Sequence, residues 1–189
     1  MKTSERGLAF LAAWEGKARW NDAKERYFPY TDVAGYPTIG VGHLIKQGED
    51  FSEGITEDQM MQILAADVMK CERAISEKVK VPLEQNQFDA LVSWSFNVGI
   101  GALWSSTLLI RLNLGKHAEV PELLLAWCNA GGKKNQGLLN RRKSEGKLWS
   151  TPYPASPADE PTRLFDLTDI ARDADDEARK PSQPPPAAA

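Results

Sequence analysis

The chain has 189 residues, enough for one domain with a sizeable core but short for two ordinary domains. Its net charge of -3 is unevenly distributed: residues 150–189 carry 8 acidic and 4 basic side chains, whereas the preceding residues carry 18 acidic and 19 basic ones. A near-neutral body without a dominant basic face argues against a dedicated nucleic-acid-binding protein, because such proteins need many cationic groups to displace phosphate counterions.

The cysteines and histidines do not have the spacing of a metal site. Cys71 and Cys128 lie far apart, and only His43 and His117 could join them, so we expect buried thiols in a reduced compartment and neither a metal nor another cofactor. The apolar run 8–14 is short for a signal sequence and ends in a glutamate, and no segment approaches the length of a membrane span. We therefore expect no stable membrane insertion and a protein that accumulates in the cytoplasm unless another protein exports or releases it.

A first helix is predicted to begin after Ser4 and to end at Glu15. Leu8, Leu11 and Glu15 are spaced by three and four residues, and Gly16 is a typical helix terminator. The carboxyl group of Glu15 would lie beside apolar side chains at the negative end of the helix dipole, and both effects favour the protonated form. That is the form a general acid needs; a surface glutamate that closes the helix is the alternative.

Residues 17–29 indicate a loop or a short helical turn. From Tyr30 to Leu44 the pattern predicts two short strands joined at a turn that begins with Asp32 and ends with Gly35, as a type I turn prefers.

The second strand of this hairpin would expose an unusually bare face. Thr38, Gly40 and Gly42 alternate along it, and glycines on one face of a strand indicate the close approach of another backbone or a ligand. Asp32 and Thr38 could meet across the turn and hold a water molecule between them. The alternative is that Asp32 serves only the turn.

Helices dominate the rest of the chain. A capping box in residues 56–59 predicts a long helix that ends near Lys80. Four further helical segments follow, at about 84–98, 106–114, 119–129 and 137–149. Strands near the N-terminus followed by helices predict an α+β, mainly α protein with two lobes joined by the long helix.

The composition changes after residue 150. Eight of the twelve prolines lie in the last 40 residues, so residues 151–189 cannot build a core and are expected to form a mostly disordered tail on a domain that spans 1–150. A weak apolar stripe at 162–180 is either a short helix that docks on the body or a partner, or a solvated, half-formed helix.

Five motifs follow one another along roughly residues 4–149. They read "WEG", "YTDVAGYPTIGVGHLI", "QFDALVSWSFNVG", "SSTLLIRLN" and "GLLNRRKSEGKLW". In this order they resemble the phage-type lysozymes, the endolysins of glycoside hydrolase family 24. The resemblance implies a lysozyme-like fold and cleavage of the β-1,4 bond between N-acetylmuramic acid and N-acetylglucosamine in peptidoglycan glycan strands, by a monomer without a cofactor.

The resemblance also assigns catalytic roles. It implies that Glu15 is the general acid, that Asp32 orients or activates the water, and that the Thr38 hydroxyl helps to hold it. An inverting enzyme would separate the carboxyl groups of Glu15 and Asp32 by roughly 6.5–9.5 Å.

Further site residues follow from the same motifs. Arg141 corresponds to an arginine that pairs with the catalytic glutamate across the lobes, and Asn97 to a residue of the cleft that contacts the substrate. His43 is expected to have a structural or supporting role at the substrate site, and Gly40 and Gly42 are expected to keep the hairpin face open to the glycan.

The chain departs from the family pattern between the two carboxylates. Sixteen residues separate Glu15 from Asp32, more than the family has, and they introduce Asp22 and Glu25 as rival carboxylates. The aromatic side chains in this insertion either stack on sugar rings or pack beneath the hairpin; they are Trp20, Tyr27 and Phe28. A lytic transglycosylase and a peptidoglycan-binding module without activity are the alternative functions.

Overall fold

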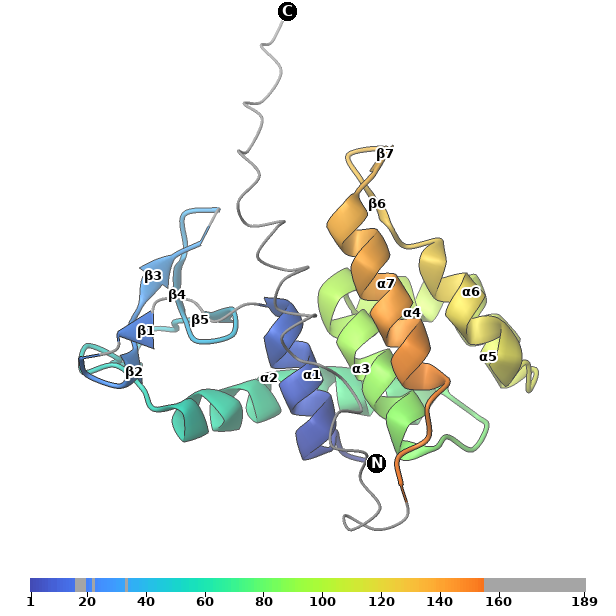
Figure 1. Cartoon of the computed structure of the whole chain (residues 1–189), viewed down its shortest axis with the longest axis horizontal. Helices are drawn as coiled ribbons and strands as arrows, with labels where there is room; N and C mark the ends of the chain where they lie inside the picture. Colours follow the sequence, from blue (N-terminus) through green and yellow to red (C-terminus); the bar gives the residue numbers. More distant parts are fainter. Residues whose placement is uncertain (16–19, 22, 33, 155–189) are drawn as a thin grey trace, which may run out of the picture.

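The structure, a computed structural model, describes residues 1–15, 20–21, 23–32 and 34–154. It has a small lobe of short strands and a larger lobe of helices, and the long helix α2 (Glu57–Lys78) runs from one to the other (Figure 1). This arrangement confirms the predicted two-lobed, mainly helical fold. The residues that lie outside the description include Gly16, Asp22 and the predicted helix at 162–180, and the side chain of Trp20 is not described either.

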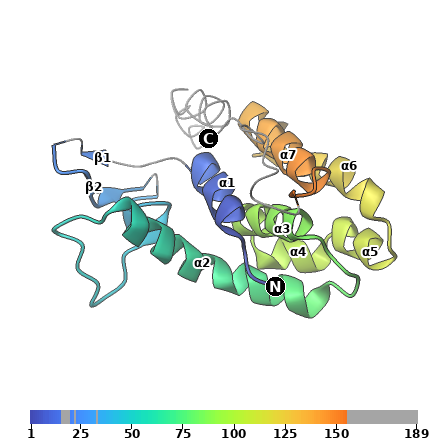
Figure 2. The same ribbon diagram turned by 60° about the horizontal axis from the view of Figure 1, so that its bottom comes forward.

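Helix α1 (Glu5–Glu15) lies between the lobes in both views (Figures 1 and 2). Ser4 caps it, because its hydroxyl accepts a hydrogen bond from the backbone N–H of Gly7 at 3.1 Å. Phe10 and Leu11 are buried in the common core, and α1 packs on both α2 and α3 (Gln85–Val98). The apolar run near the N-terminus, which has some features of a signal sequence, is therefore part of the folded domain.

The insertion between α1 and the predicted hairpin forms a hairpin of its own. Strands β1 (Trp20–Asn21) and β2 (Arg26–Tyr27) pair antiparallel, so the prediction of a loop or helical turn is wrong for this part. Tyr27 also exchanges two backbone hydrogen bonds of 2.8 Å with Ile55, and both side chains are buried. This second, distant partner of β2 is one that a local sequence pattern does not show.

The predicted two-stranded hairpin is a three-stranded antiparallel sheet. Its strands are β3 (Tyr30–Thr31), β4 (Pro37–Ile39) and β5 (His43–Leu44), in that order. The extra strand arises because Gly40 and Gly42 have φ angles of 57° and 73°, which end β4 and turn the chain back.

Helix α2 begins as predicted. The Thr56 hydroxyl accepts from the Gln59 N–H at 3.2 Å, and the Gln59 side chain accepts from the Thr56 N–H at 2.9 Å. Its buried side chains include Met60, Leu64 and Val68, at the spacing that covers one helical face. In the described part of the chain, no helix combines the length and the apolar character needed to cross a membrane.

The helical lobe packs its elements around α3. Besides α3 it contains the helices α4 (Ile100–Ser105), α5 (Thr107–Asn113), α6 (Val120–Leu125) and α7 (Gln136–Trp149) and the short 3-10 helix η1 (His117–Glu119). The predicted helices at 84–98, 106–114 and 137–149 are confirmed, whereas α4 was not predicted.

The predicted helix at 119–129 is too long. Helix α6 ends at Leu125, and the chain then forms a hairpin of β6 (Asn129–Ala130) and β7 (Lys133–Lys134). Gly131 and Gly132, both with positive φ, make its turn.

The chain stays attached to the helical lobe just beyond residue 150. The Tyr153 hydroxyl donates to the buried carboxylate of Asp89 at 2.9 Å, and the guanidinium of Arg6 lies 4.9 Å from the centre of the tyrosine ring. Asp89 also accepts from the backbone N–H of Ser4 at 3.1 Å, so one carboxylate fastens the segments before α1 and after α7.

Candidate active site

Glu15 ends α1 at the junction of the lobes and forms an ion pair with Arg141 of α7. Glu15 Oε1 lies 2.8 Å from Arg141 Nη2, and the two side chains are 24% and 6% exposed. The expected pair is present. As the last residue of its helix, Glu15 reaches beyond the buried stripe, and its nearest partner is a cation that stabilises negative charge on it.

Arg141 is held from behind by a second carboxylate. Its Nε lies 3.3 Å from Oε1 of Glu145, which is completely buried, and the Glu145 Oε2 lies 3.0 Å from Nη1 of the equally buried Arg142. Burial raises the pKa of the Glu145 carboxyl and lowers the pKa of the Arg142 guanidinium, while their mutual attraction opposes both changes. Arg142 Nη2 donates in turn to the side-chain oxygen of Asn97, which is exposed at the end of α3.

Asp32 follows β3 and is half-buried. Its Oδ1 accepts backbone hydrogen bonds from Ala34 at 2.9 Å and Tyr36 at 2.8 Å, and its own carbonyl accepts from the Gly35 N–H at 3.0 Å. The predicted turn is therefore confirmed. The other oxygen, Oδ2, accepts no hydrogen bond from the residues that the structure describes, so Asp32 can serve the turn with one oxygen and a water molecule with the other.

Thr38 lies on β4, directly opposite Tyr30 of β3, and is 1% exposed. Its hydroxyl donates to the carbonyl of Tyr36 at 3.0 Å, which fixes the proton and leaves the oxygen lone pairs as acceptors. This geometry ties Thr38 to the same turn as Asp32.

The predicted bare face exists at only one of the two glycines. A Cβ atom on Gly40 would lie 2.8 Å from the Cγ of Met60 and 3.5 Å from the Cδ1 of Ile55, so Gly40 faces α2 and the core. A Cβ atom on Gly42 would meet nothing within 4 Å. The expectation that Gly40 keeps a face open is wrong because its left-handed backbone turns it inward, whereas Gly42 is open.

Tyr30 is a site residue that the sequence analysis missed. Burial raises the pKa of its phenol, the charges of Asp32 and Glu15 raise it further, and the backbone N–H of Gly42, which donates to the phenolic oxygen, lowers it. Both carboxylates thus act on one phenol. The signal available in the sequence was its position two residues before Asp32, on the same face of an extended segment.

His43 links the small lobe to α2 and to the loop before it. Nδ1 lies 2.8 Å from Asp67, Nε2 lies 3.1 Å from Glu49, and the ring makes an edge contact with Phe51. Both nitrogens are engaged and the side chain is 8% exposed, so its contacts are those of the expected structural role.

The structure describes one of the two rival carboxylates and the side chains of two of the three aromatic residues of the insertion. Glu25 is exposed in the β1–β2 turn with a φ of 49°, and Asp22 lies outside the described residues. Tyr27 is 2% exposed and belongs to the core, so it packs beneath the small lobe, and Phe28 lies against Lys24, 5.0 Å from its Nζ.

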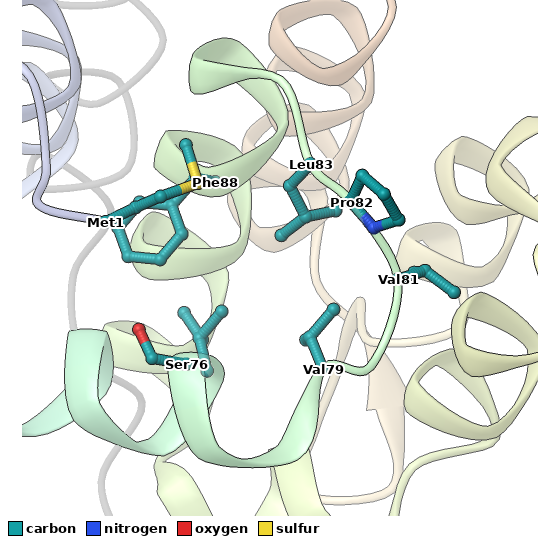
Figure 3. A pocket seen from close by; sticks show the side chains of 8 residues that line it. Met1, Ser76, Val79, Val81, Pro82, Leu83 and Phe88 are labelled. Carbon is teal, nitrogen blue, oxygen red and sulfur yellow. The ribbon is translucent and has the colours of Figure 1, made fainter.

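A pocket of about 360 Å³ lies elsewhere, at the end of the molecule where α1 begins (Figure 3). Apolar side chains from the N-terminus, the end of α2 and the following loop form most of its wall, among them Met1, Val79 and Leu83. Glu15 is at the opposite end of α1, and this pocket brings no acid or base to a substrate.

The geometry defines a class of protein. A helix-terminal carboxylate is paired with an arginine where two lobes meet, and a second carboxylate on the small lobe has an oxygen available for water. A pair of carboxylates is the arrangement of a glycoside hydrolase, and the two-lobed helical frame is lysozyme-like.

Comparison with known proteins identifies the family. Residues 21–145 match the family model described as phage lysozyme. The chain is 40% identical over 152 residues to the endolysin of Salmonella phage P22, an alignment that covers 79% of this chain and 98% of that protein. It also matches the crystal structure of a single-site mutant of P22 lysozyme with a TM-score of 0.70 and 37% identity, over 80% and 99% of the two chains. The muramidase domain of SpmX from Asticcacaulis excentricus aligns with a TM-score of 0.67 and 31% identity over the same shares.

The chain therefore belongs to the phage lysozyme family and is a glycoside hydrolase. The match to the family model includes Asp32, Thr38, Asn97 and Arg141, whereas Glu15 precedes it. The assignment of Glu15 consequently depends on its ion pair with Arg141.

Proposed function

We propose that this lysozyme hydrolyses the β-1,4 bond between N-acetylmuramic acid and N-acetylglucosamine in peptidoglycan with inversion, during lysis of the bacterial cell wall. Glu15 acts as the general acid, Asp32 activates water, and Thr38 helps to hold that water. The observation that carries the proposal is the 2.8 Å ion pair that joins Glu15 to Arg141 at the junction of the lobes.

Arg141 has two effects on an acid at position 15. In the free enzyme its positive charge attracts the Glu15 side chain and holds it in place. During cleavage the proton moves to the departing glycosidic oxygen, and negative charge develops on Glu15. Arg141 is already in place to stabilise this charge, so it assists the proton transfer itself.

Asp32 supplies the base. Because the turn engages only Oδ1, a water molecule that donates to Oδ2 would be oriented by a carboxylate that cannot rotate. Inversion requires this water to attack from the face of the sugar opposite the acid, with a separation of roughly 6.5–9.5 Å between the two carboxyl groups. Tyr30 is close enough to both carboxylates for the charge of each to raise the pKa of its phenol.

Asn97, Gly42 and the backbone around β4 are proposed to contact the glycan. Asn97 is exposed and its side-chain oxygen is held by Arg142, which leaves its amide N–H groups for a sugar acetamido or hydroxyl oxygen. His43 supports the sheet from behind, and Gly40 belongs to the core rather than to the glycan surface.

Glu15→Gln tests the acid with Glu25→Gln as its matched control. Purified peptidoglycan is digested and the fragments are analysed by mass spectrometry, while NMR of soluble glycan products gives the anomeric configuration. Glu15→Gln is expected to reduce cleavage by about 100-fold or more, and Glu25→Gln is expected to leave it unchanged. Reducing ends of α configuration support the proposal, and a β product indicates a retaining enzyme. Anhydro ends indicate a transglycosylase. If the parent protein releases no fragments, it is a binding module.

We also propose that the protein acts as a monomer and reaches the wall from the host cytoplasm with the help of another protein. Supporting this, the apolar run near the N-terminus is the buried core of α1 and leads directly to Glu15. Removing it as a signal sequence would remove the helix that carries the acid. Sedimentation velocity tests the first statement, and fractionation of expressing cells tests the second.

A further inference from the structure

Glu145 is the centre of a buried ion cluster between α3 and α7. Its Oε1 lies 3.3 Å from Arg141 Nε and accepts a hydrogen bond of 2.9 Å from the Ser93 hydroxyl, and its Oε2 lies 3.0 Å from Arg142 Nη1. Glu145 and Arg142 are completely buried. Burying three charges is costly, and packing alone does not require it.

Each arginine extends from Glu145 to a different residue at the cleft. Arg141 Nη2 reaches Glu15, and Arg142 Nη2 reaches the side-chain oxygen of Asn97. Arg141 Nη2 also donates to the Ser93 carbonyl at 3.4 Å, which fixes the plane of the guanidinium from a second direction. A single arginine thus connects the buried carboxylate of Glu145 to Glu15, and another connects it to Asn97.

We propose that Glu145 is a positioning residue for the hydrolysis: it holds Arg141 so that one nitrogen faces Glu15, and through Arg142 it also holds Asn97. The inference rests on the proposed role of Glu15 as the general acid.

The charges of the cluster balance only when Glu145 is ionised. Arg141 and Arg142 then face the carboxylates of Glu145 and Glu15, whereas a neutral Glu145 would leave two largely buried guanidinium groups with one partly exposed partner. Glu145 therefore also competes with Glu15 for the positive charge of Arg141.

Loss of this competition has a direction that can be measured. The charged and titratable groups that interact with Glu15 include Arg141 and Arg142 from α7 and Tyr30 from β3. Without the negative charge at 145, the arginines act on Glu15 uncompensated and it loses its proton at lower pH. The alkaline limb of the kcat/KM profile, which reports ionisation of the acid in the free enzyme, moves in the same direction.

The test compares pH profiles of kcat/KM on soluble glycan strands for the parent and Glu145→Gln. We expect the alkaline limb to move to lower pH by about one unit. Because the neutral glutamine leaves buried arginines short of a partner, Glu145→Asp is measured as well. It keeps the charge but draws the carboxylate, and the arginine that it holds, back by one methylene, so Glu15 loses part of its positive partner and the limb is expected to move to higher pH.

Asn86→Ala is the matched control. The buried Asn86 side chain donates to the carbonyls of Leu148 and Trp149 at 3.0 and 2.8 Å, so its removal weakens the same α3–α7 interface without changing a charge. Its melting temperature should fall and its pH profile should not move. A purely structural role for Glu145 predicts this same behaviour for the Glu145 variants.

The outcomes separate this inference from the proposed function. An unmoved alkaline limb in Glu145→Gln overturns the positioning role; if the glutamine variant does not fold, an unmoved limb in Glu145→Asp does so. In that case an inactive Glu15→Gln variant still supports the assignment of the acid. Activity retained in Glu15→Gln removes the acid assignment itself. Shifted limbs in the Glu145 variants beside an unchanged control support the proposal.

Discussion

Replacing Gly40 and Gly42 one at a time by alanine should separate the cost of backbone strain from the cost of crowding. Both have positive φ, where a Cβ atom costs about 1–2 kcal/mol. At Gly42 the new methyl group meets nothing within 4 Å, so this is the whole expected loss. At Gly40 it would lie 2.8 Å from the Cγ of Met60, which is 1% exposed and enclosed in the core.

Crowding a packed core costs about 1–3 kcal/mol more. We therefore expect Gly40→Ala to lower the free energy of unfolding by about 2–5 kcal/mol, and Gly42→Ala by about 1–2 kcal/mol. Urea unfolding followed by circular dichroism measures both, with equal m values as the check that the transitions are comparable. Equal losses in the two variants would show that Met60 moves aside freely and would refute the argument that Gly40 faces the core.

Two further changes test contacts that surround the site. The pKa of Glu49 is lowered by the backbone N–H of Lys46 and then by His43. The ionised side chain therefore stabilises the fold above its ordinary pKa, and this stabilisation disappears as the pH falls through the lower pKa of the folded protein. The difference in melting temperature between the parent and Glu49→Gln should shrink from pH 7 to pH 3, and a constant difference would contradict this. Tyr153→Phe removes the 2.9 Å hydrogen bond to Asp89 and should cost about 1–3 kcal/mol in urea unfolding, whereas an unchanged midpoint would mean that the segment after α7 does not stabilise the lobe.

Helix ends were predictable where a local signal marks them. The capping box at Thr56, the serine cap at Ser106 and the glycine at 99 each satisfy backbone groups within a few residues, so the pattern and the structure agree there. The hairpins β1–β2 and β6–β7 were missed because each strand has only two residues, too few for an alternating pattern, and β2 also pairs with the distant Ile55.

The motifs of the site could be recognised in the sequence, but the contacts that hold its side chains in place could not. The spacing around Glu15 and Asp32 points to an acid and a turn, whereas the ion pair with Arg141 entered through resemblance to a family. Glu145 was missed because its meaning depends on complete burial and on a contact with Ser93, 52 residues away. Its spacing of four and three residues from the adjacent arginines was the one available signal.

The placement of the site residues gives the two halves of the reaction different mechanical properties. Helix α1 carries Glu15, α7 carries Arg141 and α3 carries Asn97, and the three helices pack as one body. Asp32 lies beside the small sheet at the other end of α2 (Figure 1). A bend of α2 would change the distance from the acid to the water-holding carboxylate without loosening the Glu15–Arg141 pair. Such a hinge movement would therefore displace the attacking water, and the acid would keep its alignment through opening and closing.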